Sequence, residues 1–164
     1  MAKLVDTSGK ISLVLSFHQR SKLITEYEDD INNWIPIDFE VNVFEESYKI
    51  YPEVNPSLNL FEINLMFSKL KSSIREMQLT NKFKKVEIST YEFYYELEFV
   101  DLTEDDWISC TVWTFEASRT NGNIYDVQRG FRFIVTITSL RDFVNKLEEE
   151  LNLVLQNPRQ KELN

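Results

Sequence analysis

The first helical pattern lies in the middle of the chain. From Ile63 to Met77, apolar residues recur every three or four positions, which is the spacing of one face of an α-helix. Asn59, followed three positions later by Glu62, forms the residue pair of a capping box, in which each side chain bonds the backbone N–H of the other. The pattern therefore predicts an amphipathic helix at about residues 59–78.

A second helical pattern lies near the C-terminus. Apolar residues from Leu140 to Leu155 again form one stripe, and Asn-Pro follows directly after it. Ser139 and Asp142 have the spacing of a capping pair. These features predict a second amphipathic helix at about residues 140–156.

Most of the remaining chain alternates apolar and polar residues, as strands with one polar face do. The alternating segments are residues 11–18, 35–43 and 91–99. Residues 107–115 have apolar side chains on both faces, which suits a strand covered on both sides, and residues 131–137 form the last strand. Asn121-Gly122 favours a tight type I′ hairpin between the last two segments, and Gly130 favours a bulge in the returning strand. Strands and helices are segregated along the chain, which indicates an α+β fold with an antiparallel β-sheet of about six strands packed with the two helices.

The 164 residues suit a single domain over residues 1–164. Only three glycines are present and no two are close, so the chain has no glycine-rich phosphate loop. One cysteine and one histidine exclude an internal disulfide, cysteine metal knuckles and two-histidine metal sites, and we expect no cofactor and no metal. The sequence shows neither an apolar signal segment nor a membrane-spanning run, which favours a cytoplasmic protein.

Candidate catalytic residues are few. His18 follows an apolar strand pattern, and no serine or cysteine nucleophile motif accompanies it, which favours a surface or hydrogen-bonded histidine over a general base. Cys110 lies inside an apolar strand, where a free cysteine behaves as a small buried hydrophobe. Adjacent acids such as Asp29-Asp30 are typical of solvated turns. We therefore expect no catalytic site.

The net charge of −9 argues against binding to nucleic-acid backbones and to anionic membranes, and it is compatible with a basic protein partner. Residues 86–106 contain eight acids and no Lys or Arg. Strict alternation over residues 91–99 places Tyr94 on the same strand face as its neighbouring glutamates, where it would add contact area and a hydroxyl. The candidate partner-binding residues are Glu92, Tyr94, Glu96, Glu98, Asp101, Glu104, Asp105 and Asp106. A solvated sheet face without a partner is the alternative.

Two further sets of acidic residues are candidates for a partner-binding surface. Glu26, Glu28, Asp29 and Asp30, leading to Trp34, form a second candidate surface. Asp38, Glu40 and Asn42 would extend the first face if their strand lay beside it.

The chain as a whole resembles the WapI family of bacterial immunity proteins over roughly residues 30–156. The residues that carry this resemblance determine the fold and form no chemical motif. They are Asp30-Ile31-Asn32-Asn33-Trp34, Leu58 with Glu62-Ile63, the run from Phe93 to Phe99, Phe131-Arg132-Phe133, and Leu140 with Phe143 and Leu147.

The resemblance implies a non-enzymatic α+β protein that binds and neutralises the C-terminal domain of a cognate bacterial toxin. With the charge pattern, it indicates stoichiometric occlusion of a basic, nuclease-type toxin domain. A small-ligand-binding or regulatory domain is the alternative function, and an enzyme is the third.

Overall fold

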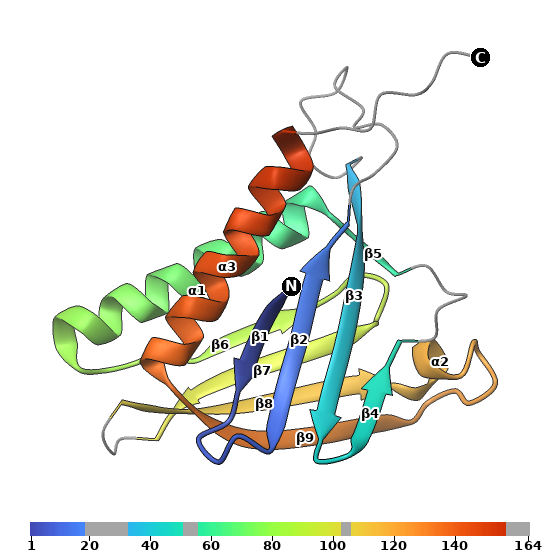
Figure 1. Cartoon of the computed structure of the whole chain (residues 1–164), viewed down its shortest axis with the longest axis horizontal. Coiled ribbons are helices and arrows are strands. Elements are labelled where there is room, and N and C mark those ends of the chain that lie inside the picture. The colour runs from blue at the N-terminus through green and yellow to red at the C-terminus, as the bar shows by residue number, and fades with distance from the viewer. Residues whose placement is uncertain (19–32, 51–55, 103–105, 157–164) are drawn as a thin grey trace.

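The computed structural model describes residues 1–18, 33–50, 56–102 and 106–156, which form two antiparallel sheets and three helices (Figure 1). The predicted α+β class is confirmed. The described strands divide between a five-stranded and a four-stranded sheet, whereas the sequence predicted about six in one sheet. The elements are β1 (Ala2–Val5), β2 (Ile11–Phe17), β3 (Trp34–Val43), β4 (Glu46–Lys49), β5 (Ser57–Asn59), α1 (Leu60–Thr80), β6 (Val86–Ser89), β7 (Tyr95–Asp101), β8 (Trp107–Phe115), α2 (Glu116–Arg119), β9 (Gln128–Thr136) and α3 (Ile137–Gln156).

The first sheet has the order β1-β2-β3-β4. Its long central strand β3 pairs with β2 along most of its length, with β4 near its C-terminal end and with the short β5 near its N-terminal end. Every pairing is antiparallel. The second sheet has the order β6-β7-β8-β9 and is a simple meander.

The two sheets are stacked, and their strands cross in Figure 1. The rings of Phe39 on β3 and Tyr95 on β7 stack with their centroids 4.1 Å apart, so the contact joins the sheets directly. α3 packs on β1 and β2, and α1 packs on α3, β5 and β6. Leu147 and Leu151 of α3 are buried, as the apolar stripe predicts. The core is therefore continuous between the sheets and the helices.

The predicted cap of α1 is confirmed. The Asn59 side chain accepts a hydrogen bond from the Glu62 N–H, and the Glu62 carboxylate accepts one from the Asn59 N–H. The predicted cap of α3 is wrong by three residues. α3 begins at Ile137, and the Thr136 hydroxyl accepts the Ser139 N–H at 3.1 Å, which is the N-cap bond.

The predicted strand over residues 91–99 starts too early. β7 begins at Tyr95, and Phe93 has a φ of 51°, so the alternation is broken between Tyr91 and Tyr95. As a result Tyr94 is buried, while Tyr91 and Phe93 are exposed.

The hairpin between β8 and β9 also differs from the prediction. The two strands do pair, but residues 116–127, including α2, connect them in place of a two-residue turn. Asn121 and Gly122 both have positive φ within this connection. Gly130 is not at a bulge: it is in register with Trp113, whose ring lies where a Cβ would be.

Candidate partner-binding surfaces

The outward face of the second sheet carries part of the predicted acidic surface. Glu96 and Glu98 of β7 lie on this face, and Glu87 of β6 is in register with Glu98. The half-exposed indole of Trp113 is in register with Glu96 on the other side, and these residues line one shallow groove. Three carboxylates and one large aromatic ring therefore share a solvent-facing surface, which we call the acidic groove.

The acidic groove also contains a base, contrary to the prediction from residues 86–106. Lys85, which directly precedes that segment, contacts Glu87 at 2.5 Å and Glu98 at 2.8 Å. The hydrogen bonds to Glu87 and then Glu98 raise the pKa of Lys85. Lys85 thus neutralises part of the charge, whereas no ion pair to Glu96 is found among the described residues.

Tyr94 does not lie in the acidic groove. It precedes β7, its side chain is buried, and its backbone N–H donates to the Thr90 hydroxyl at 2.9 Å. Burial, followed by the charge of Glu92, raises its pKa. Glu92 itself is exposed in the turn before β7. The predicted shared face of Tyr94 with Glu96 is therefore wrong, and the aromatic residue beside Glu96 is Trp113.

The remaining acidic residues of segment 86–106 do not lie together in the acidic groove. Asp101 alternates to the opposite face of β7 and accepts the Phe83 N–H at 3.0 Å. Asp106 is exposed before β8, and its carbonyl accepts the Ile137 N–H at the start of α3. Glu104 and Asp105 lie outside the described residues.

Of the second candidate surface, the structure describes Trp34. Glu26, Glu28, Asp29 and Asp30 lie outside the described residues, and Trp34 begins β3.

Asp38 and Glu40 do not extend the acidic groove, because β3 belongs to the other sheet. Asp38 contacts His18 at 2.6 Å, and Glu40 bonds Ser47 and Lys49. Burial raises the pKa of Glu40, but these bonds outweigh it and lower the pKa overall.

Cys110 is fully buried, as expected, and burial raises the pKa of its thiol. Within the described segments, no group of three His, Cys, Asp or Glu side chains is arranged to hold a metal ion. No helix among the described residues has the length and apolar character needed to span a membrane.

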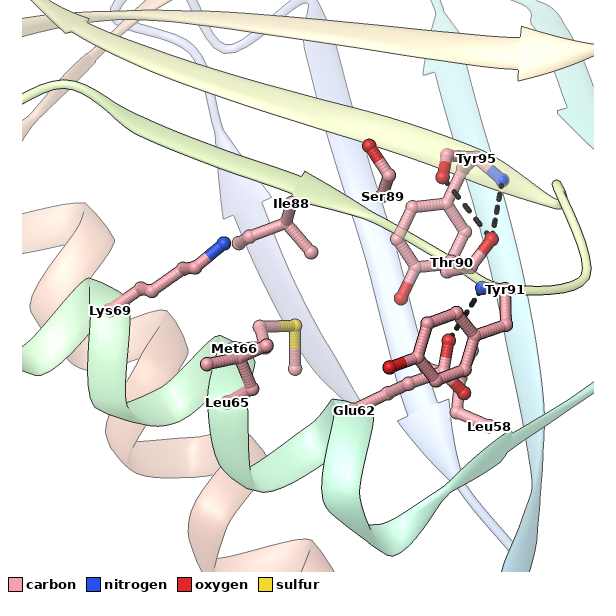
Figure 2. A pocket seen from close by; sticks show the side chains of 10 residues that line it. All are labelled: Leu58, Glu62, Leu65, Met66, Lys69, Ile88, Ser89, Thr90, Tyr91 and Tyr95. Atoms are coloured by element: carbon pink, nitrogen blue, oxygen red, sulfur yellow. Dashed lines mark hydrogen bonds between the residues drawn. The ribbon is translucent and has the colours of Figure 1, made fainter. Parts of the chain in front are cut away.

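A small pocket lies between the beginning of α1 and the end of β6 (Figure 2). Its volume is about 50 Å³, well below the several hundred Å³ of a site for a drug-sized ligand. The pocket contains the Glu62 carboxylate and the Tyr95 phenol, and Tyr91 stands at its rim (Figure 2).

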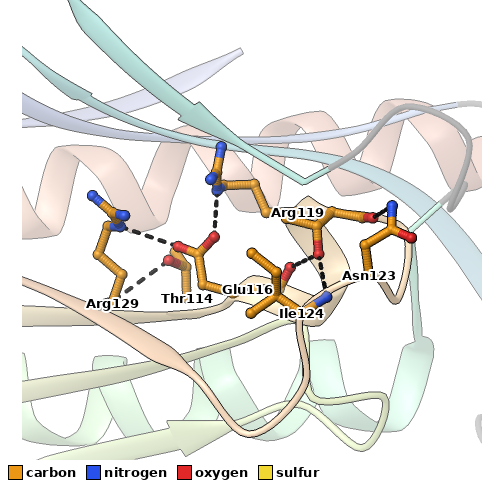
Figure 3. A network of polar contacts seen from close by, with 7 residues as sticks. Thr114, Glu116, Arg119, Asn123, Ile124 and Arg129 are labelled. Carbon is orange, nitrogen blue, oxygen red and sulfur yellow. Dashed lines mark hydrogen bonds and ion pairs between the residues drawn. The ribbon is translucent and has the colours of Figure 1, made fainter.

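A buried ion network, which the sequence did not reveal, fixes the connection between β8 and β9 (Figure 3). Glu116, only 3% exposed, accepts from Arg119 at 2.8 Å and from Arg129 at 3.1 Å. Burial raises the Glu116 pKa, but the two arginines outweigh this and lower it. Arg129 also lies 5.0 Å from the centre of the Tyr48 ring, so the network links β4 of the first sheet to β9 of the second.

The loop after this network displays apolar side chains. The Thr120 hydroxyl donates to the Glu116 carbonyl and accepts the Ile124 N–H, which orders the loop. Ile124, Tyr125 and Val127 are exposed there. The connection between β8 and β9 therefore presents aromatic and aliphatic groups to solvent.

Comparison with known proteins gives one match. The profile of the immunity protein WapI-like family matches residues 3–154, so the match includes the N-terminal strands that the sequence resemblance left out. Searches of curated proteins and of solved structures found no match.

Proposed function

The chain belongs to the WapI-like immunity protein family, and from that premise we propose that it binds the C-terminal domain of a cognate bacterial toxin and neutralises it in the cytoplasm. The family membership suggests the toxin-immunity role. We propose further that the protein acts by stoichiometric occlusion and not by catalysis, and that the toxin domain is a basic, nuclease-type domain.

The observation that best supports a basic partner is the acidic groove. Glu87, Glu96 and Glu98 of β6 and β7 lie on one side of the half-exposed Trp113 of β8, on the solvent-facing side of the sheet. Charges of one sign steer a partner of opposite sign during encounter, and tryptophan is frequent among the few residues that dominate the binding energy of an interface. The groove that holds phosphates in a nuclease is rich in Lys and Arg, and such a surface complements this one.

Toxin neutralisation is tested by co-expression of the toxin domain with this chain. The toxin domain encoded beside this gene is induced in cells that do or do not express this chain, and survival is measured. We expect survival only with the chain present, and we expect a one-to-one complex in size-exclusion chromatography with light scattering. Equal killing in both strains, or protection by traces of chain far below toxin amounts, would contradict the proposal.

A further inference from the structure

The pocket beside α1 has an apolar wall and an acceptor-rich end. Leu58, Leu65, Met66 and Ile88 supply apolar lining. The polar lining comes from Glu62, Lys69, Ser89, Thr90 and the Tyr95 phenol (Figure 2). A site with this division fits a side chain that has an aliphatic stem and a polar head.

The Tyr95 hydroxyl is a buried, unsatisfied polar group within the part of the chain that the structure describes. The residue is 0% exposed, and its hydroxyl has no hydrogen-bond partner among the described residues. Figure 2 shows the ring reaching from β7 toward α1 with the hydroxyl at the pocket end. Burial, then the charge of Glu62, raises its pKa, so it stays a neutral phenol. An unsatisfied buried hydroxyl is costly, so a partner that bonds this oxygen would be favoured.

The Glu62 carboxylate is held in position but has spare acceptor capacity. One oxygen accepts the Tyr91 N–H at 2.6 Å and the other accepts the Asn59 N–H at 3.1 Å. A carboxylate has about four lone-pair sites, so two remain for a ligand. No ion pair to Glu62 is found among the described residues. The ammonium of Lys69, which also lines the pocket, donates to the Glu87 carbonyl at 2.9 Å.

The rim of the pocket is apolar and exposed. Leu65 of α1 and Tyr91 are both more than 40% exposed and both line the pocket. The face of an aromatic ring attracts a nearby cation through a cation–π interaction. Apolar residues around a bound charged group also exclude water from the contact. The volume of about 50 Å³ suits the end of one side chain.

We propose that this pocket binds a lysine side chain of the toxin domain, with the ammonium between Glu62 and the Tyr95 oxygen and the methylene stem along Met66 and Ile88. This inference rests on the proposed function for the identity of the partner. It adds a second contact site next to the acidic groove, since Ile88 and Ser89 of β6 line both.

The first experiment requires no toxin. The whole chain is titrated with n-butylammonium, which mimics the lysine side chain, and with n-butanol, which matches its length without charge. Binding is followed by NMR at the Tyr91 amide, the group that donates to Glu62. We expect a saturable shift with butylammonium, with a dissociation constant on the order of 1–100 mM for so small a ligand, and at least a tenfold weaker response to butanol.

Two variants sharpen this titration. Glu62→Gln keeps an acceptor for the Asn59 N–H of the capping box and removes the charge, while its amide NH2 replaces the oxygen that accepts the Tyr91 N–H; it should abolish the butylammonium response. Glu76→Gln removes an exposed charge from the same helix away from the pocket and should leave the response unchanged. Equal responses to the two ligands, or none to either, would overturn the cation site and leave an ordered water as its occupant.

The second experiment uses the toxin domain encoded beside the gene. Glu62→Gln should speed dissociation of the complex at least tenfold and Tyr95→Phe severalfold, with Glu76→Gln as the matched control. Tyr95→Phe keeps the ring and removes only the unsatisfied hydroxyl, so thermal stability should be retained. Unchanged dissociation in both variants refutes the lysine contact but not toxin binding. If the wild-type chain itself fails to bind, the proposed function falls, and the butylammonium titration still decides whether the pocket binds a cation.

Discussion

The indole of Trp113 lies directly over Gly130 on the neighbouring strand. A Cβ built on Gly130 would come within 2.5 Å of a ring carbon, so no larger residue fits without movement of the ring or the strand. The absent side chain thus makes room for the aromatic ring that lines the acidic groove on its β8 side.

Gly130→Ala should therefore destabilise the protein by about 1–3 kcal/mol, because overpacking forces strain or displacement. Urea denaturation and tryptophan fluorescence will measure the stability and the position of the indole. In a Trp113→Ala background the same change should cost nothing or be favourable, since alanine suits a strand better than glycine. If Gly130→Ala lowers the free energy of unfolding equally in both backgrounds, contact with the Trp113 ring is not the cause.

The buried face of α3 should carry much of the stability. Leu147 is 0% exposed, whereas Leu153 on the same helix is 59% exposed. Leu147→Ala should cost about 2–5 kcal/mol and Leu153→Ala less than about 0.5 kcal/mol in urea denaturation. Similar costs for the two variants would mean that the helix does not pack as described.

The Glu116 network should make stability depend on pH. The pKa of Glu116 is lowered in the folded protein, so its ionised form contributes stability above the unfolded pKa of about 4.3, and this contribution is lost as the pH falls through the folded value. Glu116→Gln should cost about 1–3 kcal/mol at pH 7 by leaving two arginines poorly paired. The difference from wild type should shrink below pH 4 in denaturant titrations. A constant difference across pH 3–7 would rule out a charge effect.

The acidic groove should control association with the toxin domain. The double variant Glu96→Lys with Glu98→Lys should slow association, and low salt should enlarge the effect, because long-range attraction is screened over about 8–10 Å at ordinary salt. Trp113→Ala should instead speed dissociation. The matched control, Glu45→Lys with Glu76→Lys, changes the net charge equally at exposed sites outside the groove. If both double variants slow association equally, the effect comes from the net charge of the protein and not from the acidic groove.

Protection should survive loss of the two residues best suited to catalysis. His18→Ala and Cys110→Ala should leave toxin neutralisation unchanged in the co-expression assay. Alanine is preferred to serine at position 110 because a serine hydroxyl would be buried in an apolar site. Loss of protection by a variant that keeps its thermal stability would indicate chemistry and refute the non-enzymatic proposal.

The helices were predictable because their signals are local. The α1 cap depends on Asn59 and Glu62, three residues apart, and the stripe on each helix repeats within one turn. The cap of α3 was misplaced because Ser139 and Thr136 are both capping residues, and only the packing of the first turn selects between them.

The candidate surfaces were less predictable because they depend on register and on strand pairing. One residue of left-handed backbone at Phe93 moves Tyr94 from the expected face into the core. Whether β3 lies beside β7 or in another sheet depends on contacts between distant segments, which alternation alone does not encode. The Lys85 contacts likewise join a residue just outside the acidic segment to carboxylates on two strands.

The stack between Phe39 and Tyr95 has a consequence for recognition. The Tyr95 and Phe39 rings stack with their centroids 4.1 Å apart and an interplanar angle of 7°. The phenol oxygen of Tyr95 is therefore held in one position before any ligand binds. A flexible side chain would lose rotamer entropy on binding, whereas this one has already lost it during folding. The inter-sheet contact therefore pre-organises the pocket, and substitutions at Phe39 should alter ligand affinity although Phe39 does not line the pocket.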